Sequence, residues 1–123
     1  MLDFDALKRD ALERALRQQI QGEVRFDMPS RHLYSTDASI FSVKPMGVVI
    51  PRTQADLTAT VQITAELEVP IVPRGGGTSL SGQSIGPGIV IDCSKYLNRV
   101  LDIDPDRRTC RVEPGVVLDQ LNR

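Results

Sequence analysis

Several residue types that build common catalytic centres are scarce in this sequence. The 123 residues include one histidine, His32, no tryptophan and two cysteines, Cys93 and Cys110. A Ser/His/Asp triad or a multi-histidine metal site is hard to build from one histidine, and we expect His32 to be a surface loop residue. The cysteine spacing fits neither a disulfide framework nor a metal knuckle, so we expect both to be small buried strand residues.

A charge imbalance and long apolar runs are also missing. The formal net charge is -1, which gives no reason to expect a nucleic-acid partner, since such modules usually carry a basic face. No apolar run approaches the ~20 residues that a membrane helix needs, and the N-terminus lacks the apolar segment of a signal peptide. We therefore expect a cytoplasmic protein with one ordinary hydrophobic core.

The first part of the chain predicts one helix followed by irregular structure. The helix spans 3–21, with Asp3 as its candidate N-cap and Gly22 as its stop. Its apolar row at i, i+4 spacing consists of Leu12, Leu16 and Ile20. Residues 23–46 show little periodicity, and we expect mostly loop there, with side-chain turns at Ser35 or Asp37.

Residues 54–67 carry two conflicting signals. Apolar residues alternate strictly from Ala55 to Val69, which is the strand period. The run is much longer than the ~5–6 residues of a usual strand, and Thr53 with Asp56 three residues later forms an imperfect capping box. Length and capping favour a helix over 54–67.

The rest of the chain predicts short strands. We expect strands at 47–50, 71–72 and 88–92, a hairpin of 100–103 with 109–113 turning at 104–106, and a helix from 116. The order strand, helix, strand over 47–73 suggests a βαβ unit with parallel strands. The expected class is α+β or mixed α/β, with a lead-in at 1–32 and the main domain at 33–123.

Residues 70–83 concentrate groups that suit a phosphate. Gly75, Gly76 and Gly77 lack a Cβ, so the backbone there can take positive φ and press its amides against a ligand. Successive N–H groups in such a turn form an anion-binding concavity. Arg74 adds a planar set of cationic donors, and the hydroxyls come from Thr78, Ser79 and Ser81.

Two nucleotide motifs fail at single positions of this stretch. The Rossmann fingerprint needs a third glycine where Leu80 stands, and the P-loop needs a lysine where Gln83 stands. Nucleotide triphosphate hydrolysis is therefore improbable. A tight glycine-rich turn without any ligand is the remaining structural alternative, but three glycines in a row cost more backbone entropy than a plain turn requires.

The loop 73–83, with the sequence PRGGGTSLSGQ, resembles the pyrophosphate-binding loop of FAD-linked oxidases with the p-cresol methylhydroxylase (PCMH) or vanillyl-alcohol oxidase type of FAD domain. Segments 48–57, 88–92 and 112–116 resemble the strands and helix start around that loop. Segment 34–39 resembles the branch that contains glycolate oxidase, D-lactate dehydrogenases and related 2-hydroxy acid dehydrogenases. The resemblance covers roughly 30–123 and implies the first subdomain of a PCMH-type FAD-binding domain, truncated at the C-terminus.

The resemblance implies a set of cofactor-binding residues. The amides of Gly75, Gly76, Gly77 and Thr78 would face the FAD pyrophosphate, and Ser79 would add a hydroxyl. The flanking candidates are Pro73, Arg74, Gly82 and Gln83, with Asp37 and Ser39 as weaker ones. Arg74 either contacts the cofactor or braces the loop through carboxylates or carbonyls. Several members of the family attach FAD through a histidine at the position of Thr78, so we expect non-covalent FAD.

The resemblance also implies a function for the parent protein. We expect a flavin-dependent oxidoreductase that oxidises a 2-hydroxy acid such as lactate or glycolate and passes electrons to an iron–sulfur or other acceptor. No general base is visible in this chain, so the fragment alone should be inactive. The resemblance implies that the second subdomain, which contributes much of the adenine and isoalloxazine contact, is absent, so we expect weak FAD binding and self-association through uncovered apolar surface. The alternative is a stand-alone, non-catalytic module that binds a phosphate ligand or a partner chain.

Overall fold

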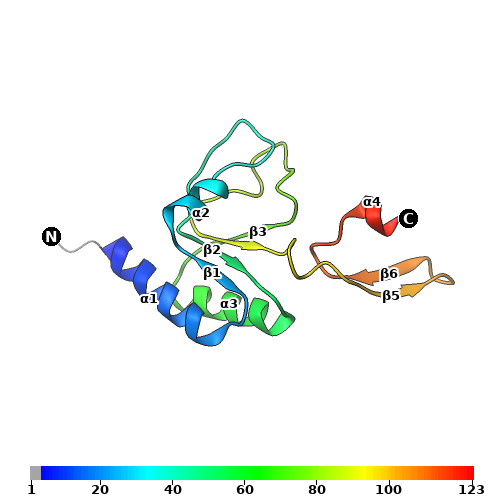
Figure 1. The fold of residues 1–123 in the computed structure, drawn as a ribbon, viewed down its shortest axis with the longest axis horizontal. Helices are drawn as coiled ribbons and strands as arrows, with labels where there is room; N and C mark the ends of the chain where they lie inside the picture. Colours follow the sequence, from blue (N-terminus) through cyan, green and yellow to red (C-terminus); the bar gives the residue numbers. More distant parts are fainter. Residues whose placement is uncertain (1–3) are drawn as a thin grey trace.

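The computed structural model describes residues 4–123, which form a four-stranded sheet, helices against it and a separate two-stranded hairpin (Figure 1). In chain order the elements are α1 (Phe4–Gln19), β1 (Glu23–Arg25), α2 (Met28–Leu33), β2 (Gly47–Ile50), α3 (Gln54–Glu66), β3 (Ile71–Arg74), β4 (Ile89–Asp92), β5 (Val100–Asp104), β6 (Thr109–Val112) and α4 (Leu118–Leu121). The mixed α/β class is confirmed. The expected N-cap Asp3 lies outside the described residues.

The sheet has the strand order β1-β2-β4-β3. Strands β2 and β3 both run parallel to β4, and β1 pairs antiparallel with β2. The expected parallel βαβ arrangement of β2, α3 and β3 is therefore present, but β4 lies between its two strands. All four residues of β4 are buried, which is typical of a central strand in a parallel sheet.

The main core lies where α1 and α3 cover one face of the sheet (Figure 1). Leu12 and Leu16 of the predicted apolar row are fully buried, and they belong to the same cluster as Val49 and Ile91. On the opposite face, a smaller cluster forms around Val48, Ile50 and Val90, against which Tyr34, Val72 and Tyr96 pack. Burial of both faces explains why β2 and the first three residues of β4 are apolar.

Helix α3 confirms the prediction from capping and length. Thr53 caps it, since its side-chain oxygen accepts from Asp56 N at 3.1 Å. The strict apolar alternation was misleading because Thr60 and Thr64, rather than Val61, face the core. Their hydroxyls donate to Asp56 O and Thr60 O, both at 2.8 Å, and this satisfies the buried polar atoms within the helix.

Residues 23–46 are mostly irregular, as expected, but their first half contains the unpredicted β1 and α2. Strand β1 is only three residues long, and it exists because it pairs with β2 through Val24 and Val49. Helix α2 is short, and its N-cap is Asp27, whose carboxylate accepts from Ser30 N at 2.9 Å. Elements this short carry no readable periodicity. His32 is exposed, but it lies on α2 rather than in a loop.

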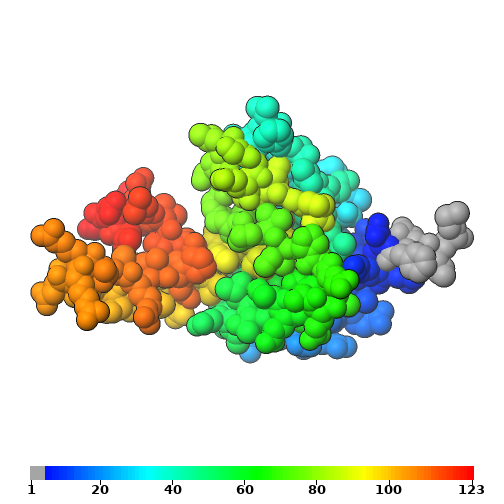
Figure 2. Space-filling view, turned by 180° about the vertical axis from the view of Figure 1, so that it is seen from behind, coloured from blue at the N-terminus to red at the C-terminus, as the bar shows by residue number. Residues whose placement is uncertain are grey.

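The hairpin of β5 and β6 is confirmed, and it stands away from the sheet (orange in Figure 2). Because the described residues leave its apolar face uncovered, Cys110 in β6 is exposed, contrary to expectation. Cys93 is buried as expected, although it comes directly after β4 rather than within it. Within 4–123, no helix is long and apolar enough to cross a membrane.

Candidate functional site

The segment that follows β3 lies at the carboxyl edge of the parallel strands. We call residues 75–83 the glycine loop. Strands β2, β4 and β3 all end at this edge, and open α/β sheets bind ligands outside the carboxyl ends of their strands. The glycine loop extends beside the segment 36–42 at the top of the molecule (Figure 1).

The backbone of the glycine loop leaves its first amides unused. Among residues 4–123, the N–H groups of Gly75, Gly76, Gly77 and Thr78 have no hydrogen-bond partner. Gly75, Gly76 and Thr78 are exposed, and Gly77 is half-buried. Consecutive free donors in a turn form a concavity suited to an anion.

The glycines of this loop serve two different purposes. Gly77 has φ +69°, a conformation that other residues rarely adopt. A Cβ at Gly75 would have nothing within 4 Å, and one at Gly76 would be 3.6 Å from the Thr78 methyl. Neither has a positive φ, so internal packing does not require glycine at these two positions. Close approach of a ligand to the backbone would explain why glycine stands at both positions.

Arg74 lies beneath the loop and braces it. Its Nη1 donates to Thr36 O at 2.8 Å and to Ser84 O at 3.3 Å. Its Nη2 is 2.5 Å from where a Cβ of Gly77 would stand, and the guanidinium lies 5.1 Å from the Tyr34 ring centroid. The described residues place no carboxylate within ion-pair distance of it. An unneutralised cation therefore lies directly behind the free amides, which favours an anionic ligand.

The second half of the loop is held by its own side chains. Ser79 Oγ accepts from Gln83 N at 3.1 Å and from Ser81 N at 3.3 Å. It also lies 3.4 Å from Gln83 Oε1, to which it donates. Gly82 has φ +73°, and a Cβ there would be 3.0 Å from the Phe41 ring. The predicted site residues 73–83 are thus the end of β3 and the glycine loop, whose second half is internally bonded.

Residues outside the loop complete the site. The Asp37 carboxylate accepts from Ser39 N and Ser84 Oγ, each at 2.9 Å. Hydrogen bonds from Ser39, that of its side chain first, and from Ser84 lower the pKa of Asp37 to about 2. Tyr34 donates to Asp92 Oδ2 at 2.5 Å. Burial, and to a smaller extent this hydrogen bond, raises the pKa of Tyr34. Sequence reasoning missed Ser84 and Asp92, because only the folded chain brings them to these partners.

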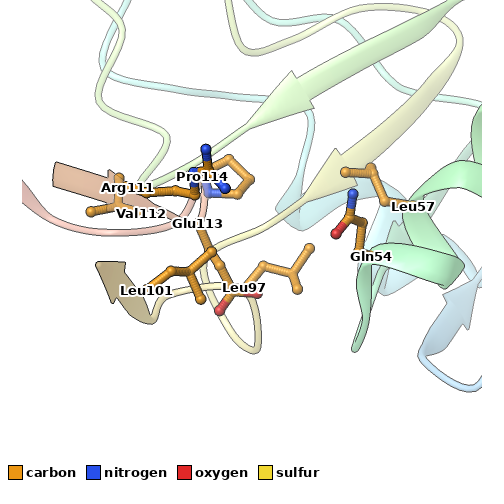
Figure 3. Close-up of a pocket in the computed structure, with 8 residues that line it drawn as sticks. All are labelled: Gln54, Leu57, Leu97, Leu101, Arg111, Val112, Glu113 and Pro114. Atoms are coloured by element: carbon orange, nitrogen blue, oxygen red, sulfur yellow. The ribbon is translucent and has the colours of Figure 1, made fainter. Parts of the chain in front are cut away.

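Two cavities lie near the hairpin and the loop. A cavity of about 170 Å³ adjoins the start of the glycine loop and is lined by Pro73, Arg74, Gly75, Cys93 and Pro114. A cavity of about 390 Å³ lies between α3 and the hairpin (Figure 3), lined by Gln54, Leu57, Leu97, Leu101, Arg111, Val112, Glu113 and Pro114. The larger cavity includes no glycine-loop residue. Among residues 4–123, no three His, Cys, Asp or Glu gather as a metal site.

The chain is similar to known proteins over most of its length. The chain is 40% identical over 114 residues to D-2-hydroxyglutarate dehydrogenase of Pantoea ananatis, which covers 90% of this chain and 11% of that protein. It is 36% identical over 103 residues to glycolate oxidase subunit GlcD of Bacillus subtilis, covering 80% of this chain and 22% of that protein. The chain therefore spans about a tenth to a fifth of the length of these relatives.

Solved structures show the same fold. An alkyldihydroxyacetonephosphate synthase matches 91% of this chain and 26% of its own, with a TM-score of 0.76 and 24% identity. A p-cresol methylhydroxylase matches 94% of this chain and 24% of its own, with a TM-score of 0.72 and 19% identity. The family described as "FAD binding domain" matches residues 45–123. The chain therefore belongs to the PCMH-type FAD-binding domain family.

Proposed function

We propose that the glycine loop binds the diphosphate of FAD without a covalent bond. The observation that carries this proposal is the row of four free amides at 75–78, with glycines at two positions where internal packing does not require them. A diphosphate needs several convergent N–H donors, and glycine allows it to approach the backbone closely. The positive charge of Arg74 behind the loop supports an anionic ligand.

Each predicted site residue has a role in this proposal. The amides of Gly75, Gly76, Gly77 and Thr78 hold the diphosphate, and Arg74 fixes the loop from beneath. Pro73 lies near the end of β3, just before the loop, and Ser79 shapes the second half of the loop. Gly82 and Gln83 flank the flavin portion. Thr78 has no nucleophilic ring nitrogen, so flavin should separate from the chain when the protein is denatured.

The parent protein is proposed to be a flavin-dependent oxidoreductase that acts on a 2-hydroxy acid. The support is that the relatives include D-2-hydroxyglutarate dehydrogenases and glycolate oxidase subunits. Bound FAD would accept a hydride from the α-carbon of the substrate. The residues of this chain would bind and orient the cofactor, and the electron acceptor would be an iron–sulfur or other redox partner.

The test is a titration of the 15N-labelled chain with FAD, ADP and AMP, followed by NMR. We expect FAD and ADP to shift the amides of 75–78 and AMP to have a weaker effect, because AMP lacks the diphosphate. FAD should bind weakly, with a dissociation constant larger than about 1 μM. Equal binding of FAD and ADP would favour the non-catalytic phosphate-binding module, and no shift at 75–78 with any ligand would refute the site.

Gly75→Ala separates ligand binding from folding. The new methyl has open space around it, so thermal stability should match the original chain. If the loop binds a diphosphate, the methyl should obstruct it and weaken FAD and ADP binding at least tenfold. Unchanged affinity with unchanged stability would contradict the proposed approach of the ligand to this backbone.

We further propose that the isolated chain self-associates through the hairpin. The register places Val100, Ile103, Cys110 and Val112 on one face of β5 and β6, and Ile103 is 62% exposed. Burial of such apolar surface favours association. Sedimentation velocity should show concentration-dependent association, which Ile103→Lys reduces and Asp102→Lys, on the opposite face, leaves largely in place. A monomer at all concentrations would contradict this.

A further inference from the structure

A segment that precedes β2 is folded against the glycine loop. We call residues 35–43 the brace segment. It is closed on itself, since Val43 N donates to Ser35 O at 2.9 Å and a bridge joins Thr36 to Ser42. Within it, Ser39 N donates to Asp37 Oδ1 at 2.9 Å, and Phe41 N donates to Ser39 Oγ at 3.1 Å. It is therefore a bonded structure rather than a free loop.

The brace segment holds the glycine loop at its far end. Asp37 Oδ2 accepts from Ser84 Oγ at 2.9 Å, and Ser84 N lies 3.4 Å from the same oxygen. Ser84 follows directly after Gln83, the last residue of the loop, and is only 8% exposed. A carboxylate that accepts from a buried hydroxyl makes a strong, directional bond. The position of this end of the loop therefore depends on Asp37.

The same segment reaches the near end of the loop through Arg74. Nη1 of Arg74 donates both to Thr36 O, in the brace segment, and to Ser84 O. The guanidinium thus joins the residue before the loop to the residue after it. Near the far end of the loop, the Phe41 ring lies against Gly82. The brace segment therefore contacts the two residues that flank the loop and Gly82 within it, and the two segments lie side by side in Figure 1.

We propose that Asp37 is a positioning residue for FAD, which holds the glycine loop in its ligand-accepting shape through Ser84. This inference rests on the proposed function of the loop. A loop that contains four glycines among nine residues loses much conformational freedom when it is ordered. If a bond outside the loop has already ordered it, the ligand does not have to do so, and binding is tighter. Asp37 itself need not touch the cofactor.

The test compares FAD affinity of four variants with that of the original chain. Asp37→Ala should weaken FAD binding about tenfold, the effect of losing one hydrogen bond to a charged group. Asp37→Asn can still bond Ser39 N and the Ser84 hydroxyl, so its affinity should stay within about threefold of the original. Ser84→Ala should weaken binding, and the double variant Asp37→Ala, Ser84→Ala should be no weaker than Asp37→Ala alone.

A matched control is Asp27→Ala. Asp27 is also a carboxylate that accepts from a backbone amide, that of Ser30 at 2.9 Å, but it caps α2 and does not contact the glycine loop. It should lower thermal stability without changing FAD affinity. If Asp27→Ala and Asp37→Ala weakened FAD binding equally, the effect would be general destabilisation, and the positioning role would be refuted.

Hydrogen exchange gives a second measurement that needs no ligand. Asp37→Ala should speed amide exchange in 75–84 while β2 and β4 exchange as before. Unchanged exchange together with unchanged affinity would overturn the inference. If the original chain bound no FAD but Asp37→Ala still loosened 75–84, the proposed function would fail while the brace itself remained. The two proposals therefore fail through different results.

Discussion

Replacing Asp56 with alanine removes a buried carboxylate that joins separate parts of the fold. Its side chain is 3% exposed. Oδ1 accepts from Gln21 N at 2.8 Å, and Oδ2 accepts from Gly22 N and Arg52 N at 2.9 Å each. Alanine leaves these three donors without their acceptor. A lost bond to a charged group costs about 1.5–3 kcal/mol, and partial rehydration of the part-buried amides reduces the total, so we expect a loss of about 3–5 kcal/mol.

Urea denaturation followed by circular dichroism measures this loss. The midpoint for Asp56→Ala should fall while the slope stays constant, since the surface exposed on unfolding is the same. Asp56→Asn keeps one acceptor oxygen, so its urea midpoint should lie between those of the original chain and Asp56→Ala. Asp10→Ala, at an exposed position of α1, is the control and should stay within about 0.5 kcal/mol. A loss below about 1 kcal/mol for Asp56→Ala would refute the reasoning.

Three further predictions concern single groups. Gly77→Ala should destabilise the fold by about 1–2 kcal/mol in thermal melts, because φ is +69° there, and an unchanged melting temperature would contradict this. Hydrogen bonds, chiefly from Lys95, lower the pKa of Glu23 from 4.5 to about 2. Glu23 therefore contributes stability above pH 4.5 that is lost as the pH falls toward 2. Glu23→Gln should flatten the free energy of unfolding against pH in this range, and an identical profile would argue against this. At a concentration where the chain is monomeric, exposed Cys110 should react with a thiol reagent in the native protein, whereas buried Cys93 should react only after unfolding; two reactive native thiols would be the contrary result.

Elements with a clear local signal in the sequence formed as predicted. The apolar row of Leu12 and Leu16 repeats over successive turns of α1, and Thr53 marks the start of α3. Strand β1 escaped prediction because three residues have no period and are ordered by pairing with β2. Cys110 was expected to be buried because cysteine is one of the most buried residue types, yet the described residues leave that face of the hairpin uncovered.

The sequence by itself determined the chemistry of the glycine loop. Glycines, a cation and hydroxyl residues in one short stretch indicate a phosphate ligand, because backbone freedom and donor type are properties of the residues themselves. Tertiary structure alone decided the strand order and the partners of Arg74, Asp37 and Ser84. These bonds join residues from 10 to 47 positions apart, and only the packing of the whole chain brings such groups within reach of each other.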